Sequence, residues 1–137
     1  MASFSILSET NSTQSNIKAL FDFLSDFKNF ASILPEDKVE NFKYSEHECS
    51  FNIKGITPMT IKVTEKKPYE FILFSSEGLA KFNFQLKAQF AGKADEKGQC
   101  SVQLLGDLNP FIKAMAEKPL THLVNVMSLK LSQLQLN

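Results

Sequence analysis

The sequence predicts an α+β fold in which an antiparallel sheet of about seven strands curves around a long C-terminal helix, with two short helices after the first strand. Between residues 39 and 105, apolar side chains recur with a period of two, and no helical segment interrupts them. Residues 109–136 then form a helix with an apolar stripe that must be buried, and the one-sided sheet is the only partner on offer. The 137 residues fit a single domain, 1–137.

The N-terminal segment begins with a strand expected at Ser3–Leu7, where apolar residues gather. The polar stretch Glu9–Ser15 is then expected to break that strand. Ser12 or Thr13 can cap a following helix, because a side-chain oxygen there accepts hydrogen bonds from free backbone N–H groups.

Two short helices are expected next. A second helical turn at Asn29–Leu34 should end before Pro35, because the residue preceding a proline avoids the helical region. The first helix is predicted by apolar residues at helical spacing: Ile17, Leu20, Phe21, Leu24 and Phe27.

From Val39 the period of the apolar residues changes to two, which indicates strands. Turns are expected at His47-Glu48 and at Lys66–Pro68. The apolar side chains that alternate with polar ones on these strands are Phe42, Tyr44, Cys49, Phe51, Ile53, Met59, Ile61 and Val63.

The later strands differ in pattern. Tyr69–Phe74 is apolar on both parities, so it is either covered on both faces or meets a partner. Lys81–Phe90 alternates cleanly, and a loop at residues 92–98 joins it to a last strand, Gln99–Leu105. The inward residues expected on these two strands are Phe82, Phe84, Leu86, Ala88, Phe90, Cys100, Val102 and Leu104.

The C-terminal helix should begin at Asn109 as its cap, with Pro110 in the first helical position. Pro119 lies inside the helix and predicts a kink or a break, because it removes one backbone hydrogen bond. Inward positions are expected at Ile112, Met115, Leu120, Leu123, Met127, Leu131 and Leu134.

The charge balance and the two cysteines limit the classes of partner and the cellular compartment that we expect. The formal net charge is zero and every basic residue is lysine, so neither a basic patch nor arginine forks support a nucleic-acid or nucleotide partner. Cys49 and Cys100 fall on inward strand positions and are expected to be buried free thiols. No signal peptide and no transmembrane segment are visible, so we expect a cytoplasmic protein.

Few residues of the sequence are candidates for catalysis or for metal binding. His47 lies between Glu46 and Glu48, where a solvated turn is favoured over a metal or acid–base cluster, and we expect no metal, no cofactor and no catalytic residue. His122 lies at the edge of the buried helix face, where it is either surface or the polar anchor of a pocket. Asp107 is interpreted as a structural residue that holds the corner between the last strand and the helix.

The aromatic content allows two interpretations. Thirteen Phe residues with no Trp supply much apolar volume without a hydrogen-bonding group, which fits either a filled core or the lining of a cavity for an apolar ligand. The candidate lining residues are Phe51, Ile53, Met59, Ile61, Phe71, Leu73, Phe82, Phe84, Leu86, Leu104, Met115, Pro119, His122, Leu123 and Met127.

Two segments resemble the START-like helix-grip superfamily (SRPBCC), which includes lipid-transfer domains, polyketide cyclases/dehydrases and coenzyme Q-binding proteins. The first, LFDFLSDFKNFASILPEDKV, carries the pattern at Asp26, Phe30, Leu34 and Pro35, which are mainly structural in such proteins. The second, LNPFIKAMAEKPLTHLV, resembles small bacterial members of uncharacterised function. The resemblance implies a helix-grip fold and a ligand class, not catalysis.

The expected function is the binding of an apolar or amphipathic, lipid-like small molecule between the sheet and the C-terminal helix, by a carrier or sensor rather than an enzyme. Polar specificity is expected from His122, Tyr69 or Tyr44. Two alternatives stay open: a polyketide cyclase/dehydrase-type enzyme, and an interaction module that dimerises through Tyr69–Phe74 without a ligand. We expect a monomer or a weak homodimer.

Overall fold

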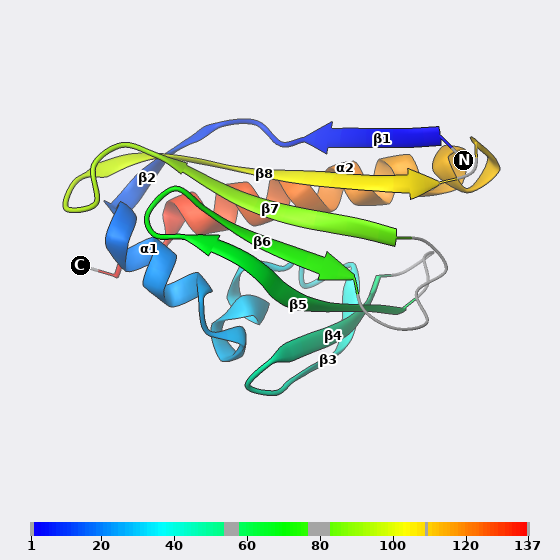
Figure 1. Ribbon diagram of the computed structural model, residues 1–137, viewed down its shortest axis with the longest axis horizontal. Helices are drawn as coiled ribbons and strands as arrows, with labels where there is room; N and C mark the ends of the chain where they lie inside the picture. Colours follow the sequence, from blue (N-terminus) through cyan, green and yellow to red (C-terminus); the bar gives the residue numbers. More distant parts are fainter. Residues whose placement is uncertain (1, 54–57, 77–82, 109, 137) are drawn as a thin grey trace.

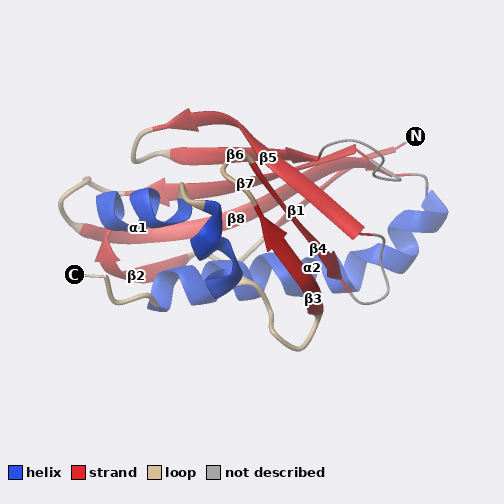
Figure 2. Cartoon of the chain, turned by 90° about the horizontal axis from the view of Figure 1, so that it is seen from below, coloured by secondary structure: helices blue, strands red, loops and turns tan. Residues whose placement is uncertain are grey.

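The computed structural model describes residues 2–53, 58–76, 83–108 and 110–136. An antiparallel sheet of eight strands curves over the long helix α2 (Pro110–Gln133). Helix α1 (Ile17–Leu24) and the 3-10 helix η1 (Phe27–Ile33) lie on the same side of the sheet as α2 (Figures 1 and 2). The predicted α+β architecture, with a long C-terminal helix gripped by a curved sheet, is confirmed.

The sheet runs in the order β1-β8-β7-β6-β5-β4-β3, and β2 also pairs with β8, beyond the end of β1. Every strand pairing is antiparallel. The turn expected at Lys66–Pro68 lies slightly later, because β5 continues to Lys67. The strands are β1 (Ala2–Leu7), β2 (Asn11–Asn16), β3 (Val39–Tyr44), β4 (Glu48–Ile53), β5 (Pro58–Lys67), β6 (Phe71–Ser76), β7 (Asn83–Ala91) and β8 (Lys97–Leu108).

The first strand ends at Leu7, before the polar segment from Glu9 to Ser15, as predicted, but most of that segment forms a further strand, β2, which was not predicted. Its alternation is carried by hydroxyl residues, since Thr13 and Ser15 are buried while their neighbours are not. Thr13 Oγ1 accepts from the Gly98 N–H (2.9 Å), so burial leaves this polar atom bonded. The cap of α1 is Asn16, whose side chain accepts from the Ala19 N–H, rather than Ser12 or Thr13.

Buried hydroxyls also fix the C-terminal half of α2 against the β1–β2 connection and β2. Ser128 Oγ donates to the Glu9 carbonyl (3.0 Å) and accepts from Asn11 Nδ2 (2.9 Å). Ser15 Oγ donates to the Leu134 carbonyl (2.6 Å) and accepts from the Leu136 N–H (2.8 Å). These bonds join segments far apart in the sequence, and we call them the serine seam.

A lysine ties the same half of α2 to the end of η1. Lys130 Nζ donates to the Leu34 carbonyl at 2.8 Å, and it lies 3.9 Å from the Glu36 carboxylate. Glu36 is almost fully exposed, so the hydrogen bond to the carbonyl is the stronger of the two contacts.

The N-terminal half of α2 is less embedded. Of the kink or break predicted at Pro119, the break does not occur, because the helix runs on through this residue, and Figure 2 shows its first turns inclined to the rest, as in a kinked helix. Met115, expected to face inward, is 62% exposed, and Phe111 is 75% exposed. The expected cap Asn109 lies outside the described residues, as does the side chain of Ile112. The buried positions of α2 begin at Ala116 and continue at Leu120, Leu123, Val124, Met127 and Leu131.

Part of the concave face is filled by the protein's own rings. Phe30, on η1, has no exposed surface, and its ring lies 5.3 Å from that of Phe74 and 6.2 Å from that of Phe51. Phe27 contacts the same cluster, at 5.9 Å from Phe74. In this region, the filled-core interpretation of the many phenylalanines is the correct one.

Both cysteines are free and buried, as predicted. Burial raises the pKa of the Cys49 thiol to about 12, with a smaller contribution from the Glu48 carboxylate. Burial likewise raises the pKa of Cys100 to about 11, although its hydrogen bond with Ser128 acts in the opposite direction. No helix of the described residues is both long and apolar enough to cross a membrane.

Truncation of Phe30 tests the ring cluster. We expect Phe30→Ala to lower the free energy of unfolding by about 3–5 kcal/mol, because it leaves a cavity among packed rings. Phe111→Ala is the matched control, and it should change stability by less than about 0.5 kcal/mol because its ring is exposed. Urea denaturation followed by circular dichroism measures both, and equal losses would contradict the packing described here.

The thiols give a pH dependence. The native Cys49 thiol keeps its proton to a higher pH than an unfolded thiol with a pKa of 9.0, so its contribution to stability is full below pH 9 and is lost as the pH rises toward about 12. We therefore expect the free energy of unfolding to fall more steeply between about pH 9 and 11 for the wild type than for Cys49→Ala. Parallel slopes in urea titrations across this range would show that the native thiol ionises as freely as the unfolded one.

Candidate functional site

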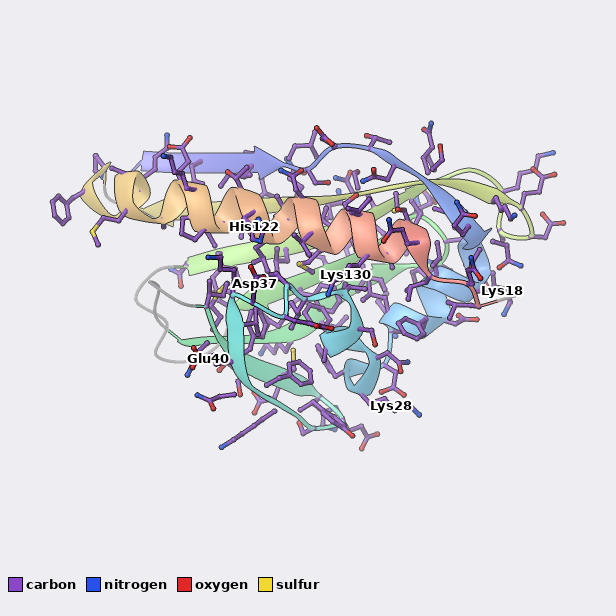
Figure 3. All side chains as sticks on the ribbon, turned by 180° about the vertical axis from the view of Figure 1, so that it is seen from behind. Lys18, Lys28, Asp37, Glu40, His122 and Lys130 are labelled. Atoms are coloured by element: carbon purple, nitrogen blue, oxygen red, sulfur yellow. The ribbon has the colours of Figure 1, made fainter. Side chains whose placement is uncertain are left out.

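A pocket of about 260 Å³ lies between the N-terminal half of α2 and the end of β4. Its lining is formed by Lys38, Ile53, Lys118, Pro119 and His122. In Figure 3, His122 lies on the side of α2 that faces the segment of Asp37 and Glu40. The pocket is therefore a space between sheet and helix, where the sequence predicted a ligand cavity. We call it the helix pocket.

The floor of the helix pocket is apolar. Ile53 is the last residue of β4 and is only 2% exposed, and Pro119 is half-buried on α2. The side chains of both residues are hydrocarbon, and Pro119 also lacks a backbone N–H group. An apolar ligand group placed on this floor would be removed from water on the protein side.

The rim of the helix pocket carries three nitrogen-bearing side chains, those of Lys38, Lys118 and His122, all exposed. Lys38 is placed by a turn after Pro35, whose carbonyl accepts from the N–H groups of Lys38 (3.2 Å) and Val39 (3.1 Å). Lys118 and His122 are four residues apart on α2, a spacing that puts them on one face of the helix.

The rim side chains have no counter-charge in the described part of the chain. Within it, no ion pair or hydrogen bond is formed by these three side chains, whereas Lys18 pairs with Asp22 at 2.9 Å and Lys130 binds the Leu34 carbonyl. Among the described residues, no carboxylate lines the helix pocket. The rim is therefore polar, basic and available to a ligand.

Most of the predicted lining residues are buried on the enclosed side of the sheet or on the inner face of α2. Three of the predicted residues, Ile53, Pro119 and His122, line the helix pocket itself. The others that are buried and contribute to the core are Phe51, Met59, Ile61, Phe84, Leu86, Leu104, Leu123 and Met127.

Three predicted lining residues point elsewhere. Phe71 and Leu73 lie on the outer face of β6, because the buried residues of that strand are Ile72 and Phe74. The ring of Phe71 is covered there by the ammonium of Lys87, 4.6 Å from its centroid. Met115 is exposed, as described above. Phe82 lies outside the described residues.

The two tyrosines considered for specificity do not line the helix pocket. Tyr44 is 58% exposed on β3, and the ring of Tyr69 packs edge-on against Phe21 at 5.5 Å. Sequence reasoning missed Lys38 and Lys118. The spacing of Lys118 and His122 was a usable signal, but the approach of Lys38 depends on how the sheet curves.

Other candidate sites are weaker. His47 is exposed in the turn before β4, with Nε2 4.0 Å from the carboxylate of Glu46, which agrees with a solvated turn. Among the described residues, no three His, Cys, Asp or Glu side chains gather in a way that could hold a metal ion.

A larger hollow of about 420 Å³ lies over the ends of β1, β6, β7 and β8, and the described side chains that line it all belong to these strands rather than to α2. Asp107 lines this hollow next to Leu108, the last residue of β8, and α2 begins at Pro110. The structural role expected for Asp107 at this corner stays a prediction. We favour the smaller helix pocket as the functional site, because it combines a buried apolar floor with unpaired polar groups.

Comparison with known proteins places the fold. No family model matches the chain, and no curated protein matches it by sequence. Solved structures do match. Norcoclaurine synthase from Thalictrum flavum superposes with a TM-score of 0.71 at 7% identity, covering 96% of this chain and 92% of that one.

Two further structures share the architecture. A START superfamily protein from Mycobacterium smegmatis has a TM-score of 0.62 at 12% identity, with 94% of this chain and 96% of that chain covered. The Zhui aromatase/cyclase from Streptomyces sp. R1128 has a TM-score of 0.60 at 14% identity, with 94% of each chain covered. At these identities the likeness concerns the fold. Together with the sheet order and the gripped C-terminal helix, it shows that this chain has the START-like helix-grip fold.

Proposed function

We propose that this protein is a binding protein, a carrier or sensor, for an apolar or amphipathic lipid-like molecule whose apolar part occupies the helix pocket. The observation that carries the proposal is the buried Ile53 floor between β4 and α2. Burial of hydrocarbon there supplies binding energy of about 0.8 kcal/mol per CH₂ group, before the cost of ordering the ligand.

The size of the helix pocket limits the ligand. Its 260 Å³ lies near the lower end of the range of about 300–1,000 Å³ usual for ligand pockets. The rings around Phe30 close the neighbouring part of the concave face. A short acyl or alkyl chain, or one end of a longer molecule, fits these limits.

Binding without catalysis is supported by the chemistry of the interior. Apart from the two thiols and the hydroxyls of Thr13 and Ser15 on β2, the buried residues of the described strands are apolar, so these strands place no carboxylate or imidazole deep in the core for proton transfer. We infer a cytoplasmic location from the two free thiols, which suit a reducing compartment.

A second candidate is a polyketide cyclase/dehydrase-type enzyme, favoured by one observation: the imidazole of His122 lines the helix pocket and could move a proton. This candidate requires that His122→Gln abolish turnover of a polyketide while leaving its binding intact. If wild-type and variant proteins are equally inactive on such substrates, the binding function stands alone.

A dimer through residues 69–74 has less support. Strand β6 is hydrogen-bonded to β5 on one side and to β7 on the other, so it cannot pair edge to edge with a second copy. Only its outer face, with Phe71 and Leu73, remains for such a contact. We propose a monomer or a weak homodimer on this basis.

Methyl NMR tests the binding proposal. With isoleucine δ1 methyl groups labelled, addition of 1-octanol should shift the Ile53 resonance saturably, because Ile53 forms the pocket floor. The matched control is Ile17, which is fully buried in α1 and does not line the helix pocket, so it should not move. Lengthening the alcohol by one CH₂ should tighten binding about fourfold if the chain is buried. If the Ile53 resonance does not shift at saturating alcohol, the binding proposal is wrong.

A further inference from the structure

We propose that the polar end of the ligand is an anion, such as a carboxylate, sulfate or phosphate monoester, held at the rim of the helix pocket by Lys38, Lys118 and His122. This inference rests on the proposed function and adds the chemical class of the ligand. It predicts that the ligand is an amphipathic anion with a short apolar tail.

The three rim side chains come together at one pocket from separate parts of the chain. Lys38 comes from the turn that follows Pro35, and Lys118 and His122 come from α2, about 80 residues later in the chain. The fold brings both segments to one pocket of 260 Å³. Two ammonium groups at one small site repel each other, and a bound anion would relieve that repulsion.

The lysines of the rim are not balanced by carboxylates in the described lining of the helix pocket. The carboxylates nearest in sequence belong to Glu36, Asp37, Glu40 and Glu117, and none of them lines the helix pocket. Glu36 faces Lys130, the lysine that binds the end of η1. Within the described part of the chain, the ammonium groups of Lys38 and Lys118 have no ion-pair partner.

The pocket has an apolar floor and a basic rim, which favours a ligand that is apolar at one end and anionic at the other. Ile53 and Pro119 give an apolar floor, and each polar side chain that lines the pocket in the described part of the chain carries a nitrogen donor. A neutral alcohol would leave the ammonium groups without a counter-charge, and a cationic amphiphile would be repelled by them. Lysine is a compact point charge with three donors, so it accepts carboxylate, sulfate or phosphate oxygens without demanding a planar fork.

The experiment compares four amphiphiles that share one tail: octanoate, octyl sulfate, 1-octanol and octyltrimethylammonium. Each is titrated at low salt into the full chain, and its dissociation constant is taken from the Ile53 methyl shift. We expect octanoate and octyl sulfate to bind about tenfold more tightly than 1-octanol, and the cation to bind most weakly. Added salt should weaken the anions and leave 1-octanol unchanged, because only the charged contact is screened.

Single variants identify the rim. Lys38→Gln, Lys118→Gln and His122→Gln should each weaken octanoate about threefold, while 1-octanol binds as to the wild type. Lys93→Gln is the matched control, because Lys93 is exposed in the β7–β8 turn and does not line the helix pocket. It removes the same charge from the chain and should leave all four dissociation constants unchanged.

The outcomes separate this inference from the proposed function. Equal affinity for octanoate and 1-octanol, both reporting at Ile53, would overturn the anionic rim and leave the binding function standing. An equal effect of Lys93→Gln and Lys118→Gln on octanoate would also overturn it, since net charge rather than the rim would then govern affinity. If none of the four amphiphiles moves Ile53, the proposed function fails and the inference fails with it.

Discussion

The serine seam is the interaction on which the rest of the structure depends. Ser15 and Ser128 are buried without exposed surface, and each both donates and accepts a hydrogen bond between the N-terminal segment and the C-terminal part of the chain, Ser128 from α2 and Ser15 with the residues just after α2. Their small side chains let the helix lie close to β2, and their bonds leave no buried polar side-chain atom unpaired in the described residues. Because this seam and Lys130 fix the C-terminal half of α2, the N-terminal half is the part that borders open space.

The shape of the interior follows from this asymmetry. At one end, η1 inserts Phe27 and Phe30 against Phe74, so sheet and helix are joined through packed rings. At the other end, Pro119 lies on α2 and lines the helix pocket. The buried phenylalanines therefore fill much of the described core, and the helix pocket that remains is small and has basic groups at its rim.

Residues whose chemistry matched their local pattern were predictable. The alternation of β7 correctly placed Phe84 and Leu86 inside, and the helical spacing of α2 correctly placed Leu123 and Met127. Strand β2 was missed because its inward residues are hydroxyls, which become compatible with burial only when distant backbone groups bond to them.

The other wrong or missed predictions concern residues whose exposure depends on how the sheet and α2 pack together. Met115 follows the apolar period of α2, but it lies on turns where the sheet does not cover the helix. On β6 both parities are apolar, and only the position of the core decides that Ile72 faces inward and Phe71 outward. The meeting of Lys38 with Lys118 depends on the curvature of the sheet, which no local pattern encodes.

Strand β8 has a consequence for the order of folding. It pairs with β1 and β2 along one edge and with β7 along the other, so that Ala2 lies opposite Leu108 and Asn11 opposite Cys100. Neither N-terminal strand has another strand to pair with, and so both must wait until β8 has been synthesised. Such long-range pairing requires loop closure before any bond is gained, which slows folding. On the ribosome, the first strands to emerge are thus among the last to find their place in the sheet.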